Sequence, residues 1–228
     1  MRKEVVVISL GGSQIIPEKI NYSYLKEFKK VILKNKEKYK FVVVCGGGSL
    51  ARNYIEAISK EKGDLKHQSF VGINATRANA RFVSYFFGYD QEEGIPHSMK
   101  TLKKYLKKRE IVFCGALEYK SDQTSDSTAA GIALKLEGEF VNLTNVKGLY
   151  DKDPSKYKNA KFMPKISWRD FDKIVQKMKF KPGQHFVLDQ TASKIIMAGK
   201  IKTVIIKNIG ELNNFLKRKK FIGTVIEG

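Results

Sequence analysis

Residues 5–13 read VVVISLGGS, and residues 41–49 show the same arrangement as FVVVCGGGS. Each segment is a continuous apolar run that ends in glycines, which is typical of a strand buried on both faces of a sheet. Between them, residues 24–39 place apolar side chains such as Leu25 and Phe28 at helical spacing, with lysines on the other face. A buried strand, an amphipathic helix and a second buried strand predict a right-handed crossover between parallel strands.

The same alternation continues along the rest of the chain. We expect further strands at residues 111–114, 139–143, 203–207 and 221–226, and further helices at residues 50–62, 74–87, 98–108, 126–137, 168–178 and 190–198. Strands that alternate with helices form a layered α/β architecture. The sequence therefore predicts an α/β fold with a doubly wound, mostly parallel sheet and helices on both faces. An apolar fraction of 42% suffices for one sizeable core, so we expect a single domain over residues 1–228.

Composition argues against several classes of protein. No run approaches the ~18 consecutive apolar residues of a membrane span, and the first apolar run meets glycines rather than a cleavage site, so we expect no membrane partner and no signal peptide. Cys45 and Cys114 are isolated and the three histidines are scattered, which suits a reducing cytoplasm and offers no metal-ligand spacing. The net charge of +20 comes mostly from lysines spread over the predicted helices. We therefore expect a solvated basic surface that steers anionic substrates, and no specific nucleic acid partner.

Two glycine loops follow the first two predicted strands. Gly11-Gly12-Ser13 comes after the first strand, and Gly46-Gly47-Gly48-Ser49 comes after the second and opens a helix. Glycine allows the backbone to approach a ligand closely, so successive N–H groups at a helix start can bind phosphate oxygens. Either loop alone also fits a simple tight turn, and neither matches a P-loop or a dinucleotide-binding loop. Two such loops on neighbouring strands predict a phosphate site at the carboxyl ends of the sheet.

A third loop at residues 144–154 has a longer motif, TNVKGLYDKDP. It resembles the amino-acid-kinase superfamily, in which T-x-V-D-G-V-Y-x-x-D-P follows a central strand and holds the adenine nucleotide. The resemblance extends over nearly the whole chain. GGGSLAR at residues 46–52, together with residues 70–73 and 76–80, looks like archaeal-type uridylate kinases within that superfamily.

The resemblance implies an ATP-dependent phosphotransferase that converts UMP to UDP. ATP and UMP are then the partners, and Mg²⁺ is the cofactor, held mainly by the ATP phosphates and not by protein side chains. The resemblance also implies a homo-oligomer such as a hexamer. It further implies an acceptor side at roughly residues 1–140 and an ATP side at roughly residues 140–228, by match to the motifs of the superfamily.

The match also implies a role for individual residues. The ATP-binding residues would be Gly11, Gly12, Ser13, Gly48, Arg52, Thr144, Asn145, Tyr150 and Asp153. The acceptor-binding residues would be Gly46, Gly47, Ser69, Leu117, Thr124 and Ser125. The catalytic residues would be Asp126, Arg52 and Lys194, with Asp126 orienting the groups around the γ-phosphate. Simpler alternatives stay open: Asp126 as a helix cap, Arg52 and Lys194 as solvated surface residues, and Tyr150 as a core ring.

Four positions depart from the superfamily pattern. Ser9 stands where many relatives have a phosphate-binding Lys, which archaeal uridylate kinases also lack. Ser69 stands where an Asp holds the ribose, and Lys147 replaces an acidic residue. The acceptor loop at residues 115–126 is longer than the G-G-T-x-P-G-x-T-T-D pattern. ATP binding is therefore better supported than UMP as the acceptor. A kinase for another small anionic acceptor and a nucleotide-binding protein with little catalysis stay open, and nucleic acid binding is the least favoured function.

Overall fold

The structure, a computed structural model, describes residues 3–89, 94–119, 124–152, 154, 157–177 and 188–228. Its strands are β1 (Glu4–Leu10), β2 (Tyr39–Cys45), β3 (Ile111–Cys114), β4 (Glu139–Leu143), β5 (Leu149–Tyr150), β6 (Phe162–Met163), β7 (Lys165–Ile166), β8 (Thr203–Ile206) and β9 (Thr224–Ile226). Its helices are α1 (Gly12–Ile15), α2 (Tyr22–Asn35), α3 (Gly48–Lys60), α4 (Leu65–Phe86), α5 (Met99–Lys108), α6 (Ser125–Leu136), α7 (Trp168–Lys177), α8 (Gln190–Gly199) and α9 (Ile209–Leu216).

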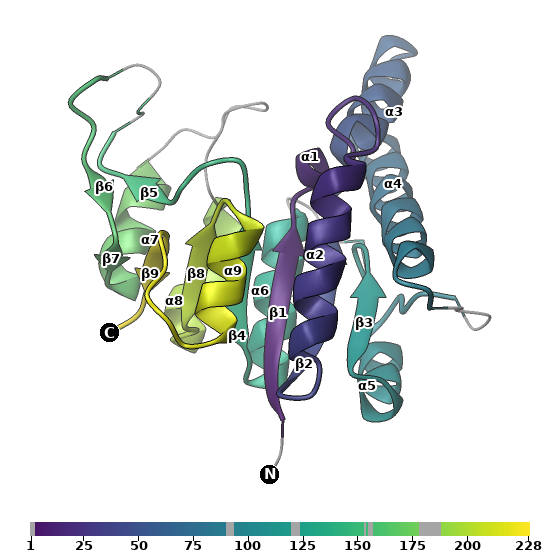
Figure 1. Ribbon diagram of the computed structural model, residues 1–228. Coiled ribbons are helices and arrows are strands. Elements are labelled where there is room, and N and C mark those ends of the chain that lie inside the picture. The colour runs from purple at the N-terminus through teal and green to yellow at the C-terminus, as the bar shows by residue number, and fades with distance from the viewer. Residues whose placement is uncertain (1–2, 90–93, 120–123, 153, 155–156, 178–187) are drawn as a thin grey trace.

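A seven-stranded sheet in the order β3-β2-β1-β4-β8-β9-β7 forms the centre of the molecule (Figure 1). β1 pairs in parallel with both β2 and β4, and β8 continues the parallel set. Because these strands are parallel, the loops that follow β1, β2, β3 and β4 all emerge at the same edge of the sheet. Both predicted glycine loops and the predicted adenine nucleotide loop therefore lie at that edge.

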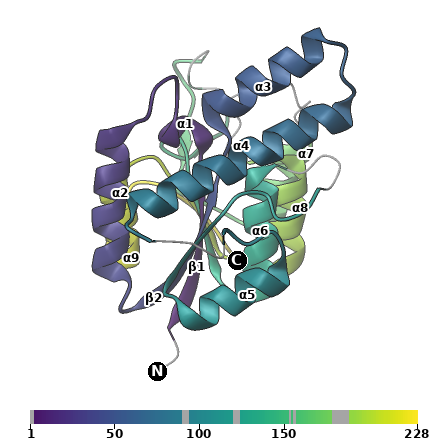
Figure 2. The same cartoon turned by 90° about the vertical axis from the view of Figure 1, so that its right-hand side faces the viewer.

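Helices cover both faces of the sheet, as Figure 2 shows. Side chains alternate along β1: Val6 and Ile8 pack in one core with α2, α9 and the end of α4, whereas Val7 packs in a second core with α5, α6 and α8. Ser9 shares the face of Val7, so its hydroxyl points toward α6 and away from α2. Within the described residues, no helix is long and apolar enough to cross a membrane.

Several elements differ from the sequence expectation. α4 begins at Leu65 instead of residue 74, because Asp64 caps it by accepting from the backbone N–H of His67 at 2.7 Å. α9 and the small antiparallel β5–β6 sheet were not expected. β9 starts at Thr224 instead of residue 221 and runs antiparallel to β8, so the parallel order stops there.

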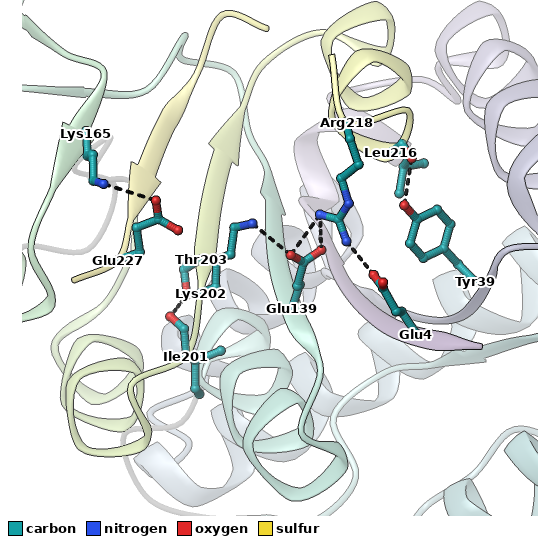
Figure 3. A network of polar contacts seen from close by, with 10 residues as sticks. All are labelled: Glu4, Tyr39, Glu139, Lys165, Ile201, Lys202, Thr203, Leu216, Arg218 and Glu227. Carbon is teal, nitrogen blue, oxygen red and sulfur yellow. Dashed lines mark hydrogen bonds and ion pairs between the residues drawn. The ribbon is translucent and has the colours of Figure 1, made fainter. Parts of the chain in front are cut away.

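A cluster of charged side chains joins the amino ends of the central strands (Figure 3). Nη1 of Arg218 donates to both carboxylate oxygens of Glu139, at 2.9 and 2.8 Å, and Nη2 donates to Glu4. Burial alone would lower the pKa of Arg218, but hydrogen bonding to Glu139 raises it above its ordinary value. Glu4 and Glu139 begin β1 and β4, so the cluster lies at the edge opposite the glycine loops. We assign it a structural role in holding the sheet, since open α/β sheets bind ligands at the carboxyl ends of the strands.

Candidate active site

The two glycine loops pack backbone against backbone at the carboxyl ends of β1 and β2. A Cβ atom on Gly12 would lie 2.0 Å from the backbone nitrogen of Gly48, and one on Gly46 would lie 2.5 Å from that of Gly12. Gly48 also has a φ of 62°, which side-chain-bearing residues adopt only with strain. The packing of the loops on each other therefore requires glycine, and it brings the two segments predicted to bind phosphate into one place.

Asn79 on α4 holds the glycine loop that follows β2. Its side-chain amide donates to the backbone carbonyls of Gly46 and Gly47, at 2.8 and 3.0 Å, and Asn79 is 4% exposed. The sequence motif around residues 76–80 gave no role for this side chain. A signal was nevertheless present, because an Asn on the buried face of a helix needs a polar partner.

The turn that begins the predicted acceptor loop is also tied to α4. The backbone N–H of Ala116 donates to Oγ1 of Thr76 at 3.0 Å, and the Arg77 guanidinium donates to the carbonyls of Ala116 and Leu117, at 3.0 and 2.8 Å. A Cβ atom on Gly115 would lie 2.5 Å from the Thr76 hydroxyl, so the turn approaches the helix closely. α4 thus anchors both the glycine loop after β2 and the turn after β3.

Asp126 lies near the start of α6, beside the carboxyl half of β1. Its Oδ1 accepts the hydroxyl hydrogen of Ser9 at 2.6 Å. Burial raises the pKa of Asp126 to about 6, while the Ser9 hydrogen bond lowers it and the negative charge of Asp189 raises it. The carboxyl group is therefore mostly ionised at neutral pH and becomes protonated in mildly acidic solution.

Thr124, and not Asp126, caps α6. Oγ1 of Thr124 accepts from the backbone N–H groups of Asp126 and Ser127, at 3.1 and 3.2 Å, and Ser127 Oγ accepts from the Thr124 N–H at 2.8 Å. This is a capping box, which satisfies the first turn without an acidic side chain. The alternative that Asp126 serves only as a helix cap is therefore wrong, since its carboxylate faces Ser9 on β1 instead.

Two predicted acceptor-binding side chains make contacts within the protein, and the role of Ser69 stays a prediction. Ser69 lies on α4, and its hydroxyl donates to the carbonyl of Leu65 at 2.7 Å. The Leu117 side chain is buried in the core that also contains α5 and α6. The structure thus does not bring the Leu117 side chain into the site, whereas Ser125 begins α6 beside Asp126.

The two predicted catalytic cations both lie on helices that start at the ligand edge. Arg52 is exposed on α3, and its Nη2 donates to the carbonyl of Pro17 at 3.0 Å, which joins α3 to the segment after α1. Lys194 is exposed on α8, five residues after Asp189. Their catalytic roles stay predictions, as do the phosphate contacts of Ser13 on α1.

The predicted adenosine-binding loop follows β4. The Thr144 N–H donates to the carbonyl of Ile206 at 3.0 Å, which fixes the first residue of this loop, and Asn145 comes next. The half-buried ring of Tyr150 packs edge to face on Phe162, with 5.5 Å between ring centroids. Asp153 lies outside the described residues. Tyr150 is therefore packed against a neighbouring ring, and its contact with adenosine stays a prediction.

The polar groups at this edge fit a metal ion that the nucleotide holds. In the part of the chain that the structure describes, no three His, Cys, Asp or Glu side chains group together to hold a metal ion. Single carboxylates such as that of Asp126, hydroxyls and backbone amides are present instead. Mg²⁺ retains several waters and commonly binds through substrate phosphates with one or two carboxylates.

Comparison with known proteins identifies the family. Residues 4–207 match the amino acid kinase family. The chain belongs to this family. The uridylate kinase of Thermococcus kodakarensis is 32% identical over 228 residues, covering 97% of this chain and 99% of that relative. The uridylate kinase of Methanocaldococcus jannaschii is 34% identical over 233 residues, covering 98% of this chain and 99% of that relative.

Solved structures agree with membership of the amino acid kinase family. The crystal structure of uridylate kinase from Archaeoglobus fulgidus has a TM-score of 0.84 at 30% identity, covering 97% of this chain and 99% of that chain. UMP kinase from Ureaplasma parvum has a TM-score of 0.80 at 22% identity and supports the fold alone. These comparisons confirm the predicted α/β fold, the predicted superfamily and the prediction of a kinase.

Proposed function

We propose that this amino acid kinase family member is a uridylate kinase, which transfers the γ-phosphoryl group of ATP to UMP with Mg²⁺. The packing of Gly12 against Gly46 and Gly48 is the observation that carries the proposal, because it joins the two loops that would hold donor and acceptor phosphates. The uridylate kinases of Thermococcus kodakarensis and Archaeoglobus fulgidus, similar over 97% of this chain, support UMP as the acceptor.

Phosphoryl transfer depends on positioning and on charge neutralisation. A phosphate oxygen of UMP forms a bond to the γ-phosphorus, and the bond from that phosphorus to the β,γ-bridging oxygen breaks, which gives UDP and ADP. Gly12 and Ser13 bind the ATP phosphates, Gly47 binds the UMP phosphate, and Gly48 contacts the transferring group. Mg²⁺, held mainly by the ATP phosphates, would supply positive charge that offsets the negative charge of the transferring group. Asp126, ionised at neutral pH, fixes the hydrogen-bond donors around the transferring γ-phosphoryl group.

Two further features belong to the proposal. We place the protein in the cytoplasm, where Cys45 and Cys114, both free and buried, stay reduced. We also expect a homo-oligomer, as the resemblance to uridylate kinases implies. Sedimentation of the purified protein measures the oligomeric state directly.

A coupled assay of ADP release tests the acceptor. UMP, CMP, AMP, GMP and small carboxylic acids are supplied separately with ATP and Mg²⁺, and we expect UMP to give the highest kcat/KM. A higher kcat/KM with any other acceptor would reject UMP as the acceptor, but the protein would still be a kinase. This comparison of acceptors is necessary because the loop at residues 115–126 departs from the superfamily pattern. Its start, at Ala116 and Leu117, is held to α4 by Arg77.

A nucleotide-binding protein with little catalysis is the second candidate, and Ser9 favours it. Ser9 gives the Asp126 carboxylate a neutral partner, where a Lys would have given it a cation. Both candidates require Mg·ATP to stabilise the fold, by about 2.7 kcal/mol at a ligand concentration 100 times Kd. Stabilisation without ADP release for any acceptor would select the second candidate, and no stabilisation at millimolar Mg·ATP would reject both.

Arg77→Met should weaken acceptor binding more than ATP binding. The substitution removes the two hydrogen bonds to Ala116 and Leu117, and bonds from a charged donor contribute about 1.5–3 kcal/mol each. We expect KM for the acceptor to rise roughly 10-fold or more while KM for ATP stays within about twofold, since 1.4 kcal/mol corresponds to a factor of 10. Arg81→Met, at an exposed arginine one turn further along α4, is the matched control. Equal acceptor KM values for both variants would contradict the anchoring role.

A further inference from the structure

A single carboxylate connects the starts of two helices at the ligand edge. Oδ2 of Asp189 accepts the hydroxyl hydrogen of Thr124, and Oδ1 accepts the backbone N–H of Ala192 at 2.8 Å. Asp189 thereby caps α8 with one oxygen and holds the cap residue of α6 with the other. Capping α8 requires only the bond to Ala192, so the bond to Thr124 needs a separate explanation.

Thr124 can serve this carboxylate only as a donor. Its Oγ1 already accepts two backbone N–H groups, from Asp126 and Ser127. A hydroxyl has two lone pairs and one hydrogen, so both of its acceptor sites are engaged and its hydrogen must go to an acceptor. The carboxylate of Asp189 supplies that acceptor. The backbone N–H of Asp126 thus donates to Thr124, and Thr124 in turn donates to Asp189 at the start of α8.

The groups that act on the Asp126 carboxylate come from two of the elements that pack around it. β1 contributes Ser9, which is neutral and donates to the Asp126 carboxylate. α8 contributes its cap residue, Asp189, whose negative charge adds to the effect of burial in raising the pKa of Asp126. α6 and α8 pack side by side, so a shift of one helix start relative to the other would change the spacing of these groups.

We infer that Asp189 is a positioning residue for phosphoryl transfer, which acts through Thr124 to fix the start of α6, and with it Asp126, against the start of α8. The inference rests on the proposed kinase function for its kinetic consequence. Its geometric content, the coupling of Asp189 to Thr124 and Asp126, does not depend on which acceptor is used. Asp189 contacts no reacting group in this scheme, and its effect passes through the cap of α6.

Asp189→Asn separates this role from helix capping. An Asn oxygen still accepts from Ala192, because Asn caps about as well as Asp. Its NH₂ group then meets a Thr124 oxygen whose acceptor sites are already used, so the link to α6 is lost. We expect kcat to fall roughly 10-fold to 100-fold, since a misplacement of about 1 Å can cost about 100-fold. We expect KM for ATP and the melting temperature to stay near wild type.

Asp64→Asn is the matched control, because Asp64 caps the exposed start of α4 through the N–H of His67. Asp189→Asn should also have little further effect on kcat in a Thr124→Val background, since both changes break the same chain of bonds. A kcat for Asp189→Asn equal to that of Asp64→Asn would overturn the inference. So would an undiminished effect of Asp189→Asn in the Thr124→Val background.

NMR titration of the Asp126 carboxyl group tests the coupling without any kinase activity. Removing the negative charge of Asp189 should lower the pKa of Asp126 from about 6, and the acid limb of the kcat/KM profile should move to lower pH with it. An unchanged pKa of Asp126 in Asp189→Asn would overturn the inference even if the wild type phosphorylates UMP. A lowered pKa in a protein that phosphorylates no acceptor would reject the proposed function and retain the coupling.

Discussion

Gly12→Ala should reduce phosphoryl transfer by about 100-fold or more and lower the stability of the fold. The new Cβ would lie 2.0 Å from the nitrogen of Gly48, 2.7 Å from its Cα and 2.8 Å from the carbonyl carbon of Gly46. All three are backbone atoms, so no side chain can rotate away and the two glycine loops must separate. Overpacking of this kind costs about 1–3 kcal/mol. A separation of about 1 Å between the loops is enough to reduce kcat/KM by about 100-fold.

Melting temperature, Mg·ATP affinity and kcat/KM should be measured on Gly12→Ala beside a matched glycine. Gly210→Ala is that control, because a Cβ on Gly210 in α9 meets no atom within 4 Å. Alanine within a helix is about 0.5–1 kcal/mol more favourable than glycine, so we expect Gly210→Ala to be at least as stable as wild type and fully active. Wild-type kcat/KM for Gly12→Ala would contradict the assignment of the active site to the paired loops.

The central strands were predictable because their signal is local. β2 ends in the continuous apolar run at residues 41–45, just before a glycine, and β4 is a mostly apolar strand that stops just before a threonine, and the structure ends both where the sequence predicts. α9 also has apolar residues at helical spacing, with Ile209, Leu212 and Phe215 buried. This short pattern was a signal for a helix that is missing from the expected elements. The first turns of α4 gave no such signal, because the exposed Leu65 and its neighbours have no apolar face.

The contacts that define the site were not predictable from local pattern. Ser9 and Asp126 are 117 positions apart, and Thr124 and Asp189 are 65 positions apart. These side chains are brought together only because α6 packs against both β1 and α8. The sequence did indicate that glycine is needed after β1 and β2. It could not distinguish glycines that approach a phosphate from glycines that approach each other, and the structure shows the second.

Asp126→Asn should reduce kcat by on the order of 100-fold or more, which is the effect of removing one preorganised electrostatic group from a reaction site. Asn keeps an oxygen that accepts from Ser9, and Thr124 still caps α6, so the fold around residue 126 is retained. ATP affinity should therefore stay near wild type. The substitution removes the negative charge that orients the donors around the γ-phosphate, and that charge is what the proposed role requires.

The pH dependence of the same variant gives a second and independent test. Burial raises the pKa of Asp126 to about 6 in the free protein, so wild-type kcat/KM should fall as the pH drops through about 6, whereas the residual kcat/KM of Asp126→Asn should not change there. The pKa of Asp126 in the folded protein lies above the ordinary value of about 3.9. The free energy of unfolding of the wild type therefore falls as the pH rises from about 4 to about 6 and Asp126 ionises. The Asn variant does not ionise at this position and should be at least as stable as wild type at neutral pH, with the advantage disappearing below about pH 4.

Asp170→Asn is the control, since Asp170 also accepts a serine hydroxyl, from Ser167 at 2.8 Å, but lies exposed on α7. A wild-type kcat in Asp126→Asn, or an acid limb that persists in it, would reject Asp126 as the group that organises phosphoryl transfer.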